Sequence, residues 1–278
     1  MIPILKGRDI DRMRNACRLS ALILREVAAA VRPGVTTAEL DDYAAERMRH
    51  HGVKSTFLGY AGFPYYTCIS VNEEVVHGFP GPRPLNDGDL VSIDLGVTAD
   101  GFTGDNAVTV PVGAAVPPAW LRLCRVTRDS LYAGLAQARA GNRVGDIGHT
   151  VQRIAESCGY GVVRDYCGHG VGRSLHLDPQ IPNYGSPRSG ARLKPGMCLA
   201  IEPMINLGTW EVEVMENEWT VKTLDRLPAA HFEHSVLVTE GDPEILTAVP
   251  PDAPACPALD LLDSAPPAPV DAAPPSQR

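Results

Sequence analysis

Two stretches of the chain occur twice in similar form, and this internal repeat restricts the fold more than any other feature of the sequence. Arg-Pro-Gly-Val-Thr-Thr-Ala-Glu-Leu at residues 32–40 resembles Arg-Ala-Gly-Asn-Arg-Val-Gly-Asp-Ile at residues 139–147. Residues 85–94, which end in Asp94, resemble residues 193–202, which end in Glu202. Because the two matches have nearly the same separation, the sequence predicts two related halves, at about residues 1–115 and 116–248.

Each half is expected to contain helices followed by strands. Apolar residues recur at helical spacing in residues 10–28 and 121–135, and Thr36 with Glu39 forms a capping-box pattern that predicts a helix over residues 37–50. Residues 90–97 and 102–110 are predicted strands joined by an Asp100-Gly101 turn, and residues 199–205 and 232–239 are further strand candidates. The predicted fold class is therefore α+β, with an antiparallel sheet covered by helices.

Bulk composition restricts the kinds of partner. The formal net charge is −8 at pH 7, which disfavours direct reading of nucleic acid and binding to an anionic membrane. Residues 1–10 lack the apolar core of a signal peptide, and no apolar run approaches the length of a membrane span. The 7 cysteines include no Cys-x-x-Cys pair, which indicates reduced thiols and a cytoplasmic location.

The C-terminal residues 249–278 differ from the rest of the chain. They are rich in proline, alanine, aspartate and serine, and they show no helical or strand periodicity. Proline at this density blocks both helix and sheet hydrogen bonds. The sequence therefore predicts a disordered tail over residues 249–278, following a folded unit at residues 1–248.

Carboxylates stand inside apolar, strand-like segments. Asp94 lies within residues 91–95, Glu202 within residues 199–204 and Glu233 within residues 231–238, and Asp105 lies on the return strand of the hairpin that carries Asp94. An ionised side chain is costly to bury unless it is paired or bound to a metal. Opposed residues of a hairpin have Cβ atoms about 4.5–5.5 Å apart, so two anions there would repel each other without a cation between them.

A histidine flanked by glycines joins these acids. Cys-Gly-His-Gly-Val-Gly at residues 167–172 places His169 where backbone or ligand can approach closely. Four carboxylates and one imidazole suit a pair of divalent ions, which can acidify a bridging water and polarise a carbonyl group. For any one of these residues alone, a solvated edge position or a salt bridge is the commoner explanation, and nothing in the sequence forces the five to converge.

Further motifs follow in a fixed order along the chain. They include Asn-Glu-Glu-Val-Val-His-Gly at residues 72–78, Gly-His-Gly-Val-Gly-Arg-Ser-Leu-His at residues 168–176, Ile-Glu-Pro-Met at residues 201–204 and Trp-Thr-Val-Lys-Thr at residues 219–223. With the five polar residues above, this series resembles the type I methionine aminopeptidase family over residues 5–240. The resemblance implies the pita-bread fold, with pseudo-twofold halves and a dinuclear metal site in its centre.

The resemblance also implies a function and a set of site residues. The expected activity is metal-dependent removal of the initiator methionine from peptides and nascent chains, at the ribosome, with preference for a small second residue, by a monomer. Glu202 is expected to move a proton from water to the leaving amine, His176 to donate to the scissile carbonyl and His77 to contact the scissile amide. The implied ligands of two ions (Co²⁺, Mn²⁺, Fe²⁺ or Zn²⁺) are Asp94, Asp105, His169, Glu202 and Glu233, of which Asp105 and Glu233 bridge.

A methionine pocket is the last site that the resemblance implies. Its expected lining is Tyr60, Phe63, Cys68 and Trp219, because aromatic and sulfur groups suit a thioether, although these residues could equally form plain core. Two positions depart from the family pattern. Leu175 stands where many relatives have an aromatic residue and Phe57 where some have cysteine, which leaves the fine substrate preference open.

Three other functions compete with this interpretation. A proline-directed aminopeptidase of the same fold resembles the same ligand set, but such relatives have a sizeable extra N-terminal domain, whereas only about 90 residues precede Asp94 here. A non-catalytic binding protein of this fold is expected to lose ligands, all of which are present. An iron oxygenase built on His169, His176 and one acid would leave the other acids unexplained.

Overall fold

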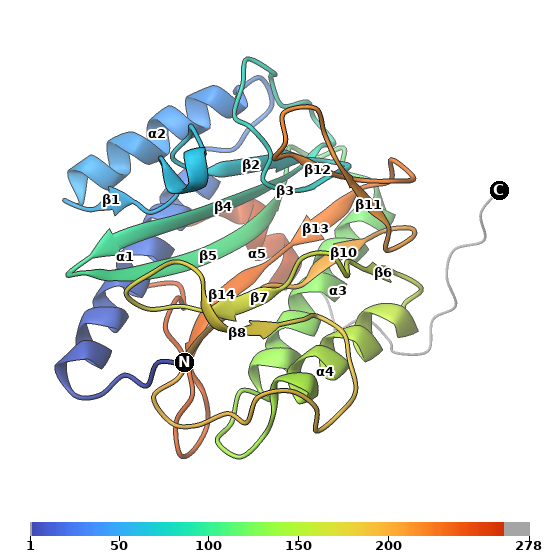
Figure 1. Ribbon diagram of the computed structural model, residues 1–278. Coiled ribbons are helices and arrows are strands. Elements are labelled where there is room, and N and C mark those ends of the chain that lie inside the picture. Colours follow the sequence, from blue (N-terminus) through green and yellow to red (C-terminus); the bar gives the residue numbers. More distant parts are fainter. Residues whose placement is uncertain (1, 264–278) are drawn as a thin grey trace.

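The computed structural model describes residues 2–263, and its centre is one large antiparallel sheet (Figure 1). The helices are α1 (Arg8–Ala29), α2 (Thr37–His50), α3 (Pro118–Leu135), α4 (Val144–Ser157) and α5 (Pro257–Asp263), with a 3-10 helix, η1, at Tyr60–Gly62. The strands are β1 (Lys54–Ser55), β2 (Cys68–Val71), β3 (Glu74–Val76), β4 (Leu90–Ala99), β5 (Phe102–Pro111), β6 (Gly161–Val162), β7 (Gly168–Gly170), β8 (Leu177–Ile181), β9 (Cys198–Ile201), β10 (Met204–Asn206), β11 (Val212–Val214), β12 (Val221–Thr223), β13 (Ala229–His231), β14 (Glu233–Leu237) and β15 (Glu244–Ile245).

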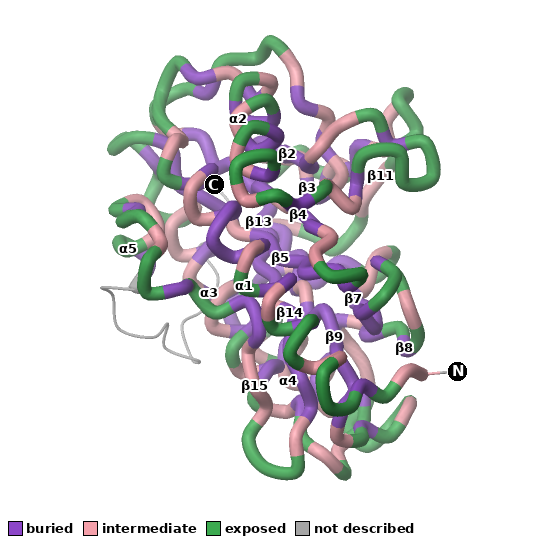
Figure 2. Tube along the Cα trace, turned by 90° about the vertical axis from the view of Figure 1, so that its left-hand side faces the viewer, coloured by how far each residue is buried: buried purple, intermediate pink, exposed green. Residues whose placement is uncertain are grey.

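The main sheet has nine strands in the order β1-β4-β5-β14-β9-β7-β8, with β2 paired to β4 and β15 paired to β14. Outwards from β5 the sheet continues with β4 and then β2, and outwards from β14 it continues with β9 and then β7. The two sides of the sheet are therefore built in the same way. The pairing of β5 with β14 is therefore the seam between two related halves. Helices α1, α3 and α5 lie on one side of this sheet (Figure 2), which agrees with the predicted α+β class.

Backbone hydrogen bonds repeat between the halves where the sequence repeats. The N–H of Gly34 donates to the Leu85 carbonyl at 2.8 Å, and the N–H of Gly141 donates to the Leu193 carbonyl at 3.1 Å. Each of these leucines precedes a strand of the main sheet, and each glycine precedes the second helix of its half. The internal similarity thus corresponds to a pseudo-twofold arrangement. The division near residue 115 remains a proposal.

Local sequence signals explain the first half well. The Thr36 N–H donates to the Glu39 carboxylate at 2.7 Å, so the predicted capping box begins α2. Asp100 and Gly101 join β4 to β5 with φ values of 52° and 76°, as expected for a tight hairpin turn. The predicted helices and this hairpin are confirmed within three residues of their ends.

Of the two later strand predictions, the strand at residues 232–239 is confirmed as β14 within two residues of its ends, and the strand at residues 199–205 needs correction. The segment 199–205 forms two strands, β9 and β10, which separate at Glu202 and Pro203. The segment 232–239 begins after a similar break at Phe232, since β13 ends at His231 and β14 begins at Glu233. At these breaks the chain passes between the main sheet and a three-stranded sheet of β13, β10 and β6. Pro203 has no N–H to continue a ladder, which explains the first break.

The predicted disordered tail is wrong for its first part. Residues 257–263 form α5, and Cys256 and Leu262 on this segment are only 2% and 1% exposed. Pro257 stands at the first helical position, where a missing N–H costs nothing, and the other prolines of this part precede the helix. Residues 264–278 lie outside the described part of the chain. None of the helices among residues 2–263 is long and apolar enough to cross a membrane.

Candidate active site

The β4–β5 hairpin sets the positions of the first two acids. The register pairs Asp94 with Ala107 and Gly96 with Asp105. Asp94 and Asp105 therefore share one face of the hairpin but are diagonal neighbours, not directly opposed ones. A side chain at Gly96 would crowd both Phe57 and the Asp105 carboxylate, because an added Cβ would lie 2.9 Å and 3.3 Å from their atoms. Glycine here keeps the space between the two acids open.

The seam between the halves brings two glutamates to the same place. Strand β14 pairs Glu233 with Ala107, the residue that also faces Asp94. Strand β9 ends with Ile201 opposite His234, so Glu202 follows at the point opposite Glu233. The break after β9 therefore places an acid beside the main sheet, where the chain turns away.

His169 completes the group from β7. Its Nδ1–H donates to the Gly170 carbonyl at 3.0 Å, which leaves the lone pair on Nε2. That Nε2 lies 3.6 Å from Asp105 Oδ2 and 3.5 Å from Glu202 Oε1. The flanking glycines are needed by the sheet, because a Cβ at Gly168 would collide with the Ala200 carbonyl.

The donor atoms of this cluster are suited to a metal. One ligand atom from each of Asp105, His169 and Glu233 lies within 4.8 Å of the others, and Asp94 and Glu202 line the same cavity. Asp94 Oδ1, Asp105 Oδ1 and Glu233 Oε1 are buried without a hydrogen-bond partner among the described residues. Buried oxygens of this kind are costly unless a cation or donor satisfies them, so the residues present fit hard divalent ions.

The protein alone opposes ionisation of these acids. Burial raises the pKa of Asp105 to about 7. Burial, with repulsion from neighbouring carboxylates, raises the pKa values of Asp94, Glu202 and Glu233 well above their usual range. Burial also lowers the pKa of His169 to about 4, so its imidazole is neutral and able to act as a ligand. A cation at the centre of the cluster would lower the pKa values of these four carboxyl groups and so reverse the effect of burial.

A cavity of about 120 Å³ opens directly over the cluster. Its apolar wall includes Phe57, Phe63, Cys68 and Leu175, which form one buried group, with Trp219 packed against it. The rings of Phe63 and Trp219 meet edge to face with centroids 5.0 Å apart. Every residue of the expected methionine pocket borders this cavity, as do the metal-ligand candidates. Its lining residues are Phe57, Tyr60, Phe63, Cys68, His77, Asp94, Asp105, His169, Leu175, His176, Glu202, Trp219 and Glu233.

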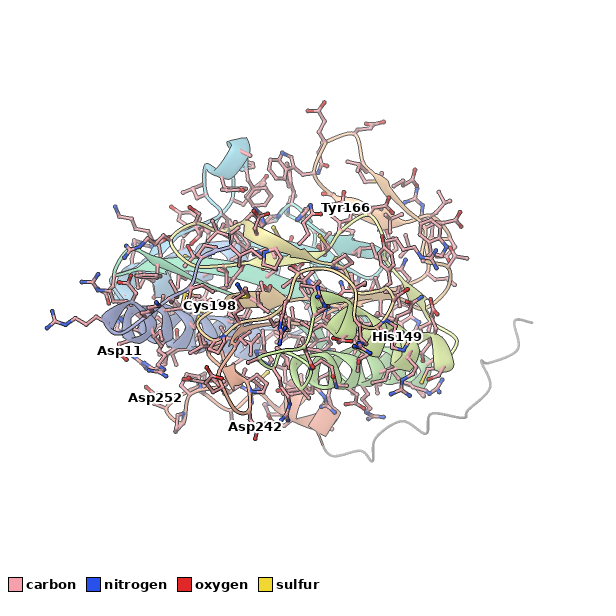
Figure 3. All side chains as sticks on the ribbon, turned by 60° about the horizontal axis from the view of Figure 1, so that its bottom comes forward. Asp11, His149, Tyr166, Cys198, Asp242 and Asp252 are labelled. Carbon is pink, nitrogen blue, oxygen red and sulfur yellow. The ribbon has the colours of Figure 1, made fainter. Side chains whose placement is uncertain are left out.

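Two further histidines flank the acids. The ring of His176 lies edge to face on His169 with centroids 4.4 Å apart, and the ring of His77 packs on Tyr166 at 5.5 Å. Burial lowers the pKa of His77 to about 4 and also lowers the pKa of His176. Both rings border a second cavity, of about 240 Å³, beside Glu202. Tyr166, labelled in Figure 3, lines that cavity as well.

His231 is a polar residue of the site that the sequence motifs did not indicate. Its Nε2 lies 3.7 Å from Glu202 Oε2 and has no hydrogen-bond partner among the described residues. The side chain is 2% exposed and borders the second cavity. His231 lies two residues before Glu233, and residues two apart in a strand have side chains on the same face. This spacing was the only signal in the sequence that could have indicated it.

Comparisons with known proteins agree with this geometry. The model of a family described as metallopeptidase family M24 matches residues 11–240. The chain is 48% identical over 242 residues to methionine aminopeptidase 1 of Bacillus subtilis, a match that covers 87% of this chain and 97% of that protein. It is 45% identical over 251 residues to methionine aminopeptidase of Escherichia coli, with 88% and 94% covered.

Solved structures show the same relationship. The crystal structure of methionine aminopeptidase from Thermotoga maritima has a TM-score of 0.87 and 46% identity, covering 89% of this chain and 99% of that one. The prolidase from Pyrococcus horikoshii has a TM-score of 0.73 at 20% identity, and the match spans 64% of that chain, which shows a shared fold alone.

The family match and the buried acid cluster together define the class: the chain belongs to metallopeptidase family M24 and has its pita-bread fold. Within that family the near-complete similarity in length and sequence places it among the methionine aminopeptidases. The expected family and fold are thus confirmed.

Proposed function

We propose that this chain removes the N-terminal methionine from peptides and nascent proteins by hydrolysis at a two-ion centre. The observation that carries the proposal is the buried group formed by Asp105, His169 and Glu233 at the floor of an apolar cavity. A cavity of this kind can hold an uncharged, flexible side chain while the peptide bond next to it meets the polar floor. A methionyl aminopeptidase needs that combination.

Five residues would hold the two divalent ions. Asp105 and Glu233 lie at the seam and would contact both, and Asp94, His169 and Glu202 would complete the set. When bound, the ions supply a nucleophilic hydroxide near neutral pH and polarise the scissile carbonyl. Co²⁺, Mn²⁺, Fe²⁺ and Zn²⁺ all accept carboxylate and imidazole ligands, and their availability decides among them.

The remaining groups of this chain serve proton transfer and orientation. Glu202, whose carboxylate is buried between His169 and His231, accepts the proton of the attacking water and returns it to the leaving amine. His176 donates a hydrogen bond to the carbonyl oxygen as negative charge develops there. His77 contacts the scissile amide nitrogen and positions the substrate.

The apolar wall gives specificity for methionine. Phe63, Cys68 and Trp219 present aromatic edges and sulfur to the thioether, which gains from such contacts. Phe57 and Leu175 belong to the same buried group, so both departures from the family pattern change the shape of this wall. A small second residue in the substrate is preferred, because the side chain that follows methionine must fit between the histidines beside Glu202.

The cellular setting follows from the substrate and the thiols. All seven cysteines are free and six are buried, which suits a reducing compartment, and nascent chains carrying methionine occur in the cytoplasm at the ribosome. We propose that the enzyme acts there as a monomer.

A peptide assay with controlled metal tests the proposal. Metal-free protein is supplied with Mn²⁺ or Co²⁺, and release of methionine from Met-Ala-Ser and Met-Leu-Ser is measured. We expect metal-dependent cleavage of the first peptide only. Cleavage of neither, with metal demonstrably bound, would point to a different substrate, and absence of metal binding would overturn the enzyme assignment.

A further inference from the structure

The phenol of Tyr60 contacts a histidine at the mouth of the cavity. Its hydroxyl oxygen lies 2.7 Å from His176 Nδ1, and the two rings meet edge to face with centroids 5.1 Å apart. Tyr60 is 41% exposed, whereas Phe63 and Cys68 in the wall of the cavity are 3% and 5% exposed. The hydroxyl group of Tyr60 therefore points to His176. A residue that only lined an apolar pocket would not need this contact.

The chemistry of the two groups favours one direction for this hydrogen bond. A phenolic O–H is a good donor, and its oxygen is a poor acceptor because its lone pairs conjugate with the ring. A neutral imidazole has one acceptor nitrogen and one N–H. Tyr60 Oη–H therefore donates to Nδ1 of His176, and the ring proton resides on Nε2.

The neighbouring histidine is fixed in the opposite tautomer. His169 donates from Nδ1 to the Gly170 carbonyl at 3.0 Å, so its Nε2 has a free lone pair. The two rings are in contact, yet one is held as a ligand and the other as a donor by a different partner on each Nδ1. Selecting a tautomer through the second ring nitrogen is a general way to assign a role to a histidine.

The backbone around Tyr60 holds the hydroxyl in place. The Tyr60 N–H donates to the Phe57 carbonyl and the Phe63 N–H donates to the Tyr60 carbonyl, both at 2.9 Å. Gly59 and Ala61 on either side have φ values of 83° and 48°, so the turn is tight. The phenol therefore reaches from the first half of the chain to a histidine of the second half.

We propose that Tyr60 is a positioning residue, which holds His176 in the Nε2–H tautomer so that Nε2 is the donor to the scissile carbonyl oxygen. The catalytic part of this inference rests on the proposed function, because it concerns a step of that reaction. The tautomer itself does not depend on the reaction and can be measured without substrate.

Steady-state kinetics of Tyr60→Phe test the catalytic part. The variant keeps the ring and loses the hydroxyl, so we expect kcat to fall about 10-fold, less than the 10²–10³-fold typical of losing an oxyanion donor outright, with KM changed less than about 2-fold. Tyr65→Phe is the matched control, because Tyr65 packs on Phe63 and Phe79 through its ring, and it should leave both constants unchanged.

A double variant separates positioning from a structural role. If Tyr60 acts through His176, Tyr60→Phe should cause no additional loss in a His176→Ala background, since coupled residues are not additive. A full additional 10-fold loss there, or a change in KM alone, would overturn the proposal.

The tautomer is read directly from ¹⁵N chemical shifts of histidine-labelled, Zn²⁺-loaded protein, with the His176 signals assigned from a His176→Asn variant. We expect the Nε2–H form in the wild type and a shift towards a mixture of tautomers in Tyr60→Phe. An Nδ1–H form in the wild type, or no change in the variant, would overturn the inference. Failure of the wild type to release methionine would instead remove the proposed function and leave this measurement to decide the tautomer.

Discussion

Glu202 stands between two histidines at the end of a strand, and this position defines its expected role. Glu202→Gln keeps the shape of the side chain but cannot carry a proton. We expect kcat to fall by about 10²–10⁴-fold, the usual contribution of a general acid–base group. The metal content of the variant should be measured beside its kinetics, because Glu202 is also a ligand candidate. Normal turnover by a fully loaded variant would exclude Glu202 from proton transfer.

His231 is expected to act through Glu202. Its unpartnered Nε2 lies 3.7 Å from Glu202 Oε2, close enough to restrict that carboxylate. We predict that His231→Ala lowers kcat by about 10–100-fold, as loss of a residue that orients a metal ligand does. His149→Ala on α4 is a control with no contact to the site. Equal kinetics for the two variants would show that His231 has no such role.

The buried acids also predict how the metal-free protein responds to pH. The folded-state pKa of Asp105 is raised to about 7, and those of Asp94, Glu202 and Glu233 are raised as well. A carboxyl group whose pKa is raised by folding stabilises the fold below its unfolded pKa, and that stabilisation is lost as the pH rises through the folded value.

We therefore expect the Tm of the metal-free protein to fall between about pH 5 and about pH 8. Added Mn²⁺ should raise Tm more at the higher pH, because ions need ionised carboxylates. Differential scanning fluorimetry with and without metal measures both effects. A Tm of the metal-free protein that rises over this range would contradict the shifts.

At the residue scale, the ligand candidates could be found in the sequence but the contacts of Tyr60 could not. Asp94, Glu202 and Glu233 stand out because an acid inside an apolar strand needs a physical reason. The Tyr60–His176 bond joins residues 116 positions apart, and no local pattern in the sequence links the two.

Among the elements, α1 packs closely on β5, and this contact should tolerate little change. A Cβ at Gly104 would collide with the backbone of Ala16 and Cys17 in α1. We expect Gly104→Ala to lower the free energy of unfolding by about 1–3 kcal/mol, the usual cost of overpacking. Gly81→Ala, where an added Cβ has nothing within 4 Å, is the control. Urea unfolding of both variants measures the difference, and equal midpoints would show that α1 can shift.

The elements that the sequence predicted well are those specified by local chemistry. The capping box at Thr36 and the Asp100-Gly101 turn need only neighbours in sequence. The break between β9 and β10 was harder to predict, because the residues on either side of Glu202 and Pro203 are apolar and the segment from Leu199 to Ile205 resembles one strand. Pro203 interrupts the ladder, and the pairing of β9 with β14 and of β10 with β13 places the two parts in different sheets.

At the scale of the molecule, α5 joins the hydrophobic cores of the two halves. Leu259 packs against both main core clusters, Cys256 belongs to one and Leu262 to the other. Arg25 of α1 binds the segment through Asp260 at 2.6 Å. The composition of residues 249–278 does not indicate this helix, because the prolines around it dominate the average composition of the segment.

A substitution in α5 tests whether this segment contributes to folding stability. Leu262 is 1% exposed, and Leu262→Ala should lower the free energy of unfolding by about 2–4 kcal/mol. Leu224→Ala, at a leucine that is 52% exposed, should change it by less than about 0.5 kcal/mol. Thermal and urea unfolding give both values. A Leu262→Ala protein as stable as the wild type would mean that α5 is detached in solution.

The seam between β5 and β14 has a consequence for the order of events during synthesis. Asp94 and Asp105 are made before Glu233, which lies on β14, a strand that pairs with β5 but follows it by more than 100 residues. A growing polypeptide that stops before β14 has an open edge on β5 and an incomplete set of acids. If Glu233 holds metal as proposed, a newly made molecule becomes competent only after β14 has left the ribosome, and a translation product that stops before β14 cannot cleave other chains.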